Sequence, residues 1–118
     1  MVQLEKYTGA SRDFLAKAQK ALAQGDLVQA SEKGWGAAAQ MVKAVAAKRR
    51  WRHNGHGALF QVVDRLVEET GNPQLDILFQ VANSLHNNFY ENWLPIGAVE
   101  RGLDRVREFV QSMDRILQ

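Results

Sequence analysis

The sequence has 118 residues, no cysteine, and 15 Lys and Arg against 13 Asp and Glu. The missing cysteines exclude a disulfide framework and a thiolate metal site. No uninterrupted apolar run approaches the roughly 20 residues of a membrane span, and the first residues mix charged and apolar side chains too closely for a signal peptide. We therefore expect one cytoplasmic domain over residues 1–118, with no membrane contact.

The near-neutral total hides an uneven distribution of charge along the chain. Residues 1–59 carry ten cations and four anions, whereas residues 60–118 carry five cations and nine anions. No acidic residue occurs between Glu32 and Asp64, although that stretch holds six Lys and Arg. An asymmetry of this kind indicates either an anionic partner or self-association.

The first of five predicted helices is expected over about residues 11–24, where apolar side chains recur on one stripe. Gly25 is a suitable residue to end it in the left-handed conformation. Asp26, followed three positions later by Gln29, has the form of a capping box for the next helix. These signals predict a tight hairpin of two helices.

The second predicted helix covers about residues 27–50 and contains two glycines, Gly34 and Gly36. Each disfavours a helix by roughly 1 kcal/mol relative to alanine, so their presence needs a reason. Gly34 lies on the apolar stripe, and we interpret it as a place where a neighbouring helix approaches closely. The alternative is a ligand against the bare backbone. The stripe consists of Ala30, Gly34, Ala38, Met41 and Val45.

Three further helices complete an expected all-α fold. The third follows the glycine-containing turn at residues 53–57, and the fourth runs from Pro73 to about Trp93, before Pro95. The last carries apolar residues at alternating intervals of four and three from Val99 to Leu117. Such a seam suits a bundle or a dimer helix. The sequence therefore predicts an up-and-down antiparallel bundle of four to five helices.

A cluster of cations with a tryptophan occurs at the end of the second predicted helix. Cations hold phosphates through charge-assisted hydrogen bonds, and Trp51 among them is suited to stacking on a base. The alternative is a solvated helix end whose cations complement the helix dipole. The predicted phosphate-binding residues are Lys48, Arg49, Arg50, Arg52 and His56.

Polar side chains at helical spacing define a second candidate region, on the fourth predicted helix. They offer donors and acceptors for a base, a ribose or a phosphate; the alternative is a half-buried polar layer that fixes helix register. The predicted ligand-binding residues are Asn83, His86, Asn87 and Tyr90. His53 and His56 have no carboxylate near them in the sequence, so neither a metal site nor a cofactor is predicted.

Three segments of the chain carry a family pattern: GDLVQASEKGWGAAAQMVKAVA at 25–46, RRWRHNGHGAL at 49–59 and LFQVANSLHNNFYENW at 78–93. Together they resemble the HEPN superfamily (higher eukaryotes and prokaryotes nucleotide-binding), in its archaeal PaREP branch. The resemblance implies a helical bundle that forms a homodimer and takes a nucleotide or RNA ligand. It also implies a relation to the substrate-binding subunits of minimal nucleotidyltransferases.

Many members of that superfamily are metal-independent ribonucleases that use an arginine followed, after four to six residues, by a histidine. In this sequence His86 stands where the arginine is expected, and no histidine follows at that interval. Arg50 and His56 have the spacing but lie in another turn. We therefore predict nucleotide or RNA binding without catalytic residues. The alternatives are a helical protein-interaction subunit that partners a nucleotidyltransferase and a ribonuclease with a rearranged site.

Overall fold

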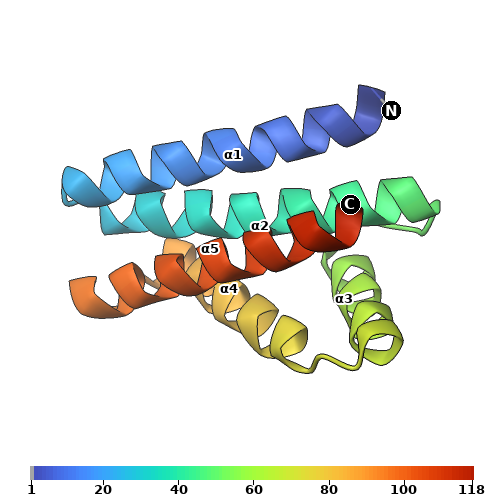
Figure 1. The fold of residues 1–118 in the computed structure, drawn as a ribbon. Helices are drawn as coiled ribbons and strands as arrows, with labels where there is room; N and C mark the ends of the chain where they lie inside the picture. Colours follow the sequence, from blue (N-terminus) through green and yellow to red (C-terminus); the bar gives the residue numbers. More distant parts are fainter. Residues whose placement is uncertain (1) are drawn as a thin grey trace.

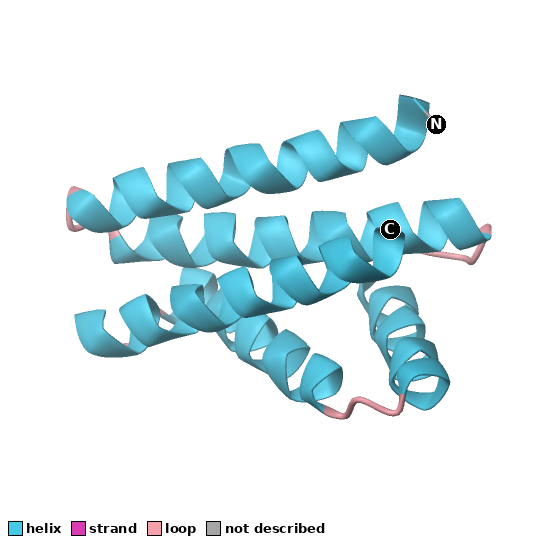
Figure 2. Cartoon of the chain, in the orientation of Figure 1, coloured by secondary structure: helices cyan, strands magenta, loops and turns pink. Residues whose placement is uncertain are grey.

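Five helices make up the computed structural model, which describes residues 2–118 (Figure 1). They are α1 Val2–Ala23, α2 Leu27–Arg49, α3 His56–Thr70, α4 Gln74–Glu91 and α5 Ile96–Leu117. Short turns join them, and the described part of the chain contains no strand (Figure 2). The predicted all-α class is confirmed.

Three of the helices lie alongside one another, while α3 and α4 slant across them (Figure 1). The turn at residues 24–26 makes α1 antiparallel to α2. α3 and α4 then return the chain toward the beginning of α2, so α5 runs in the same direction as α2 (Figure 1). None of the helices within residues 2–118 is both long and apolar enough to cross a membrane.

Helix α1 begins at Val2, so the prediction that it starts near Ser11 was wrong. Ser11 is fully buried in the middle of α1, and its hydroxyl donates a hydrogen bond to the backbone carbonyl of Ala37, 2.8 Å away in α2. Serine favours helix starts because its hydroxyl bonds nearby backbone. Here the hydroxyl bonds a neighbouring helix instead, which the local sequence does not reveal.

The predicted turn between α1 and α2 is confirmed. Gly25 has φ 77°, a left-handed conformation that glycine adopts without a steric penalty. The Asp26 carboxylate accepts a hydrogen bond from the backbone N–H of Gln29 at 3.1 Å and so caps α2. These local interactions fix the α1–α2 hairpin, along which Phe14 packs against Gly36.

Gly34 lies at the point where α2 meets α4 and α5. A Cβ atom at this position would lie 2.5 Å from Leu103 Cδ2 and 3.1 Å from Leu85 Cδ1. The close-approach interpretation is therefore confirmed, and the space that a ligand would need is filled by leucine side chains. The whole predicted stripe is buried in the core: Ala30, Gly34, Ala38, Met41 and Val45.

Candidate functional site

Two histidines from different helices stack on one tryptophan. His56 is the first residue of α3 and His86 lies in α4, and their ring centroids are 5.3 Å apart. The ring of Trp35, in α2, lies 4.7 Å from His56 and 5.1 Å from His86 between centroids. Because three helices each supply one ring, the stack forms only when α2, α3 and α4 pack together.

A hydrogen bond orients each histidine ring. Nδ1 of His86 lies 3.1 Å from Oε1 of Glu32, and it donates because an ionised carboxylate only accepts. Nε2 of His56 lies 2.7 Å from Oδ1 of Asn83, and an amide oxygen likewise only accepts. In the neutral imidazoles these bonds leave Nε2 of His86 and Nδ1 of His56 as acceptors. We name the whole group the histidine site: Glu32, Trp35, His56, Asn83, His86 and Tyr90.

The polar residues predicted on α4 divide between two faces of the helix. Tyr90 packs edge-on against the His86 ring, with centroids 5.4 Å apart, and Asn83 bonds His56. Asn87 is exposed and forms no side-chain hydrogen bond with residues 2–118. The structure thus brings three of the four predicted residues together, and Asn87 projects about 100° away from His86.

Sequence reasoning missed the contribution of α2 to this site. Trp35 is almost completely buried, at 8% exposure, and packs on Phe79 as well as on the two histidines. Glu32 lies nearly one helical turn before it and reaches His86. A large aromatic residue between Gly34 and Gly36 was the available signal. Within residues 2–118, no three His, Asp or Glu side chains are grouped so as to hold a metal ion.

The cations predicted to bind phosphate do not form a single cluster. Nη1 of Arg49 pairs with Oε1 of Glu69, in α3, at 2.6 Å. Nζ of Lys48 donates a hydrogen bond to the carbonyl of Leu117, at the end of α5. Both side chains therefore connect the end of α2 to neighbouring helices. His56 belongs to the histidine site and not to this group.

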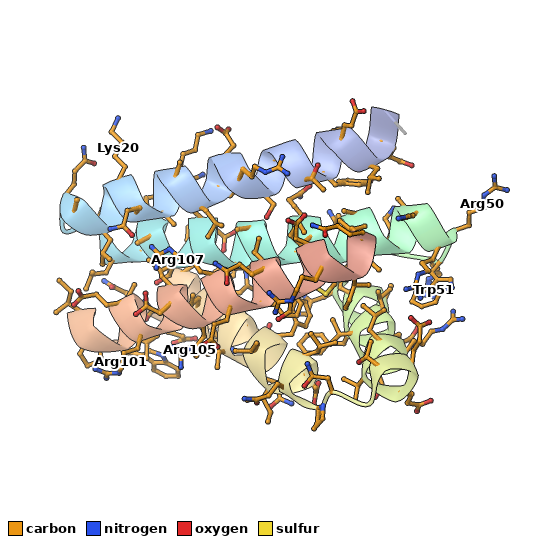
Figure 3. The ribbon with its side chains drawn as sticks, in the orientation of Figure 1. Lys20, Arg50, Trp51, Arg101, Arg105 and Arg107 are labelled. Carbon is orange, nitrogen blue, oxygen red and sulfur yellow. The ribbon has the colours of Figure 1, made fainter. Side chains whose placement is uncertain are left out.

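Trp51 is occupied by contacts within the protein. The Arg65 guanidinium lies 3.8 Å from the centre of its ring, and that of Arg49 lies 5.1 Å away. These cation–π contacts join α3 to the end of α2. Arg50 and Arg52 remain exposed without an acidic partner among residues 2–118, and Arg50 points away from the bundle (Figure 3).

A hollow of about 400 Å³ lies between the beginning of α1 and the end of α2. Two of the predicted phosphate-binding cations, Lys48 and Arg50, line it together with Gln3, Leu4 and Ala47. The hollow faces α1, whereas the histidine site lies on the side of α2 that faces α3 and α4. The two candidate regions are therefore separate places on the molecule.

The chain matches the model of a described family and is similar to a solved structure. A family model described as "Archaeal PaREP1/PaREP8 family" matches residues 6–110. A crystal structure of a Sulfolobus solfataricus protein has a TM-score of 0.80 and 27% identity, and the match covers 92% of this chain and 97% of that chain. No curated protein matches the chain. The family model spans every residue of the histidine site.

Proposed function

We propose that this chain, which belongs to the archaeal PaREP1/PaREP8 family, is a HEPN-like helical protein that binds a nucleotide or RNA at the histidine site. The observation that carries the proposal is the convergence of His56 and His86 on Trp35. A half-buried polar layer that only fixes helix register needs neither an exposed ring nor a free acceptor. Here His56 and Tyr90 are exposed, and a free acceptor nitrogen remains on each histidine.

The chemistry of the site suits a nucleotide because it combines aromatic rings with both kinds of hydrogen-bonding group. The exposed rings offer stacking surfaces, which are worth about 1–3 kcal/mol per base in proteins that bind single strands. The Glu32 carboxylate accepts hydrogen bonds, and the amide group of Asn83 both donates and accepts. A base, which carries a flat face and a polar edge, satisfies both features at once.

Arg52 is suited to contact a phosphate beside this site. It is exposed and lies four residues before His56 in the turn that leads into α3. Four residues span at most roughly 14 Å, so its guanidinium group stays within reach of a ligand that extends from the site by one or two nucleotides. Arg50 belongs to the same turn but points away from the bundle (Figure 3).

Replacing either stacked histidine is expected to weaken ligand binding. We expect His86→Ala and His56→Ala each to lower the affinity for a fluorescein-labelled RNA octamer by about 10-fold, because each removes a ring and a hydrogen-bonding group. Arg52→Glu should also weaken binding and make it less dependent on salt. Fluorescence anisotropy at several salt concentrations measures both effects.

His53 provides the matched control for this experiment. Its ring contacts Tyr7 and the Trp51 carbonyl, away from the histidine site. His53→Ala is therefore expected to keep wild-type affinity, with circular dichroism verifying that all variants are folded. The proposal fails if the wild-type protein binds neither RNA nor adenosine monophosphate, or if the three histidine variants bind equally well.

RNA cleavage is a second candidate function, favoured by the nitrogen that each histidine keeps free of a hydrogen bond within the protein. Nε2 of His86 can take the proton from a ribose 2′-hydroxyl as its oxygen attacks the adjacent phosphorus. A protonated Nδ1 of His56 then gives a proton to the departing 5′-oxygen, which leaves a 2′,3′-cyclic phosphate and a 5′-hydroxyl. Such general acid–base catalysis contributes about 10²–10⁴-fold per group. The Glu32 contact fixes the tautomer that this role of His86 requires.

This second function predicts that the purified protein cleaves RNA in the presence of EDTA. His86→Ala and His56→Ala should each reduce the rate by at least about 100-fold. Glu32→Gln should reduce it less, because the histidine remains but is no longer held in one tautomer. Gel analysis of a labelled oligonucleotide measures the rate and the cyclic phosphate. Equal cleavage by the wild-type protein and by both histidine variants would assign the activity to a contaminant.

A further inference from the structure

The turn between α4 and α5 exposes an unusual amount of apolar surface. Among residues 2–118, four large apolar side chains are prominently exposed, and three of them lie within seven residues: Tyr90 at 70%, Trp93 at 67% and Ile96 at 52%. The fourth, Ile77, lies on a different face of α4 from Tyr90. Clustered apolar exposure of this kind marks an interaction site more often than a scattered residue does.

A buried asparagine holds the backbone beneath this surface in place. The Oδ1 atom of Asn88 accepts hydrogen bonds from the backbone N–H groups of Trp93 and Leu94, each at 2.9 Å. Its Nδ2 atom donates to the hydroxyl of Ser31, in α2, also at 2.9 Å. Asn88 has no exposed surface. The backbone that carries the exposed tryptophan is therefore anchored to the core.

This surface adjoins the histidine site. Tyr90 is a prominently exposed aromatic ring of the histidine site and contacts His86, while Trp93 follows three residues later in the chain. The guanidinium group of Arg101 lies beside Gly97, at the beginning of α5, and pairs with no acidic side chain of residues 2–118. Figure 3 shows Arg101 at that end of α5. The exposed aromatic rings and an unpaired cation thus lie on the two sides of the α4–α5 turn, with Tyr90 in contact with the site.

We propose that Tyr90 and Trp93 stack on the bases of a single-stranded RNA, one nucleotide of which occupies the histidine site. This inference rests on the proposed function and specifies its ligand as an extended strand and not a free nucleotide. Aromatic rings stack on any base, and Arg101 supplies a charge for the phosphates between them.

The test compares an RNA octamer with adenosine monophosphate, in the wild-type protein and in single variants. We expect Trp93→Ala and Tyr90→Ala each to weaken octamer binding by about 5- to 100-fold. Trp93→Ala should leave the affinity for adenosine monophosphate unchanged. Ile77→Ala is the matched control, because it removes another exposed apolar side chain, 53% exposed, from a different face of α4. Octamer addition should also quench tryptophan fluorescence in the wild-type protein more than in Trp93→Phe.

Several outcomes would overturn this inference and leave the proposed function intact. One is equal affinity of the wild-type protein for the octamer and for adenosine monophosphate. Another is octamer binding by Trp93→Ala that matches the wild-type protein. A third is a homodimer, measured by light scattering, that Trp93→Ala dissociates while octamer binding persists, which would assign the surface to a second copy. If the wild-type protein binds neither ligand, the proposed function fails as well.

Discussion

Asn88→Ala is expected to lower the free energy of unfolding by about 2–4 kcal/mol, a large effect for one polar side chain. The substitution removes the acceptor of two backbone N–H groups, those of Trp93 and Leu94, and the donor to Ser31. Leaving buried polar groups without partners costs more than the mean value of a hydrogen bond. Guanidinium denaturation followed by circular dichroism measures the change.

Two further variants separate the contribution of the hydrogen bonds from other effects. Asn87→Ala changes the neighbouring exposed residue and should alter the stability by less than about 0.5 kcal/mol. Ser31→Ala removes the acceptor of the Asn88 amide group but keeps both backbone hydrogen bonds to Asn88 Oδ1, so an intermediate loss is expected. Equal stability of Asn87→Ala and Asn88→Ala would show that the buried amide does not anchor the α4–α5 turn.

The pair Asn87 and Asn88 illustrates what the sequence could not decide. Both flank the apolar stripe of α4, and a helical projection separates them by only about 100°. Sequence reasoning assigned a ligand to Asn87 and passed over Asn88. The structure buries Asn88 completely and exposes Asn87. Which asparagine points into the core depends on the positions of Ser31 in α2 and of the α4–α5 turn. Those positions are set by the tertiary structure and not by the local sequence.

The fold was more predictable than the site because its signals are local. Gly25 and Asp26 determine a turn by their own conformation and hydrogen bonding, and the structure confirms both. The histidine site depends instead on contacts between residues far apart in the chain. The bond between His56 and Asn83 joins two helices, and no single segment predicts it. The homodimer and the nucleotidyltransferase partner depend on contacts with other chains, and both remain predictions.

The basic segment shows that a charge pattern does not reveal partners that are distant in sequence. No acidic residue lies near Arg49 in the chain, which favoured a phosphate ligand. In the folded protein Arg49 meets Glu69 from α3, and Arg65 covers Trp51. The acid-rich second half of the chain therefore compensates part of the basic first half within one molecule. Arg50 and Arg52 are what remains available to an anionic ligand.

Gly34→Leu is expected to lower the free energy of unfolding by about 3 kcal/mol or more, at the upper end of measured overpacking effects. Even the first carbon of the new side chain would lie 2.5 Å from Leu103 and 3.1 Å from Leu85. Leucine adds three further carbons, so α2 has to move away from both α4 and α5. Thermal and guanidinium denaturation measure the loss.

Gly9 offers the matched control because it is also inside a helix, but a Cβ atom added there would have no neighbouring atom within 4 Å. Gly9→Ala should raise the free energy of unfolding by about 0.5–1 kcal/mol, because alanine favours a helix and meets no obstacle at this position. The two glycines thus have opposite expected effects although both lie within helices. If Gly34→Leu were as stable as the wild-type protein, the three helices would not meet closely at Gly34. In that case the contact between Gly34 and α4 would not hold α4, and with it His86, in position against α2.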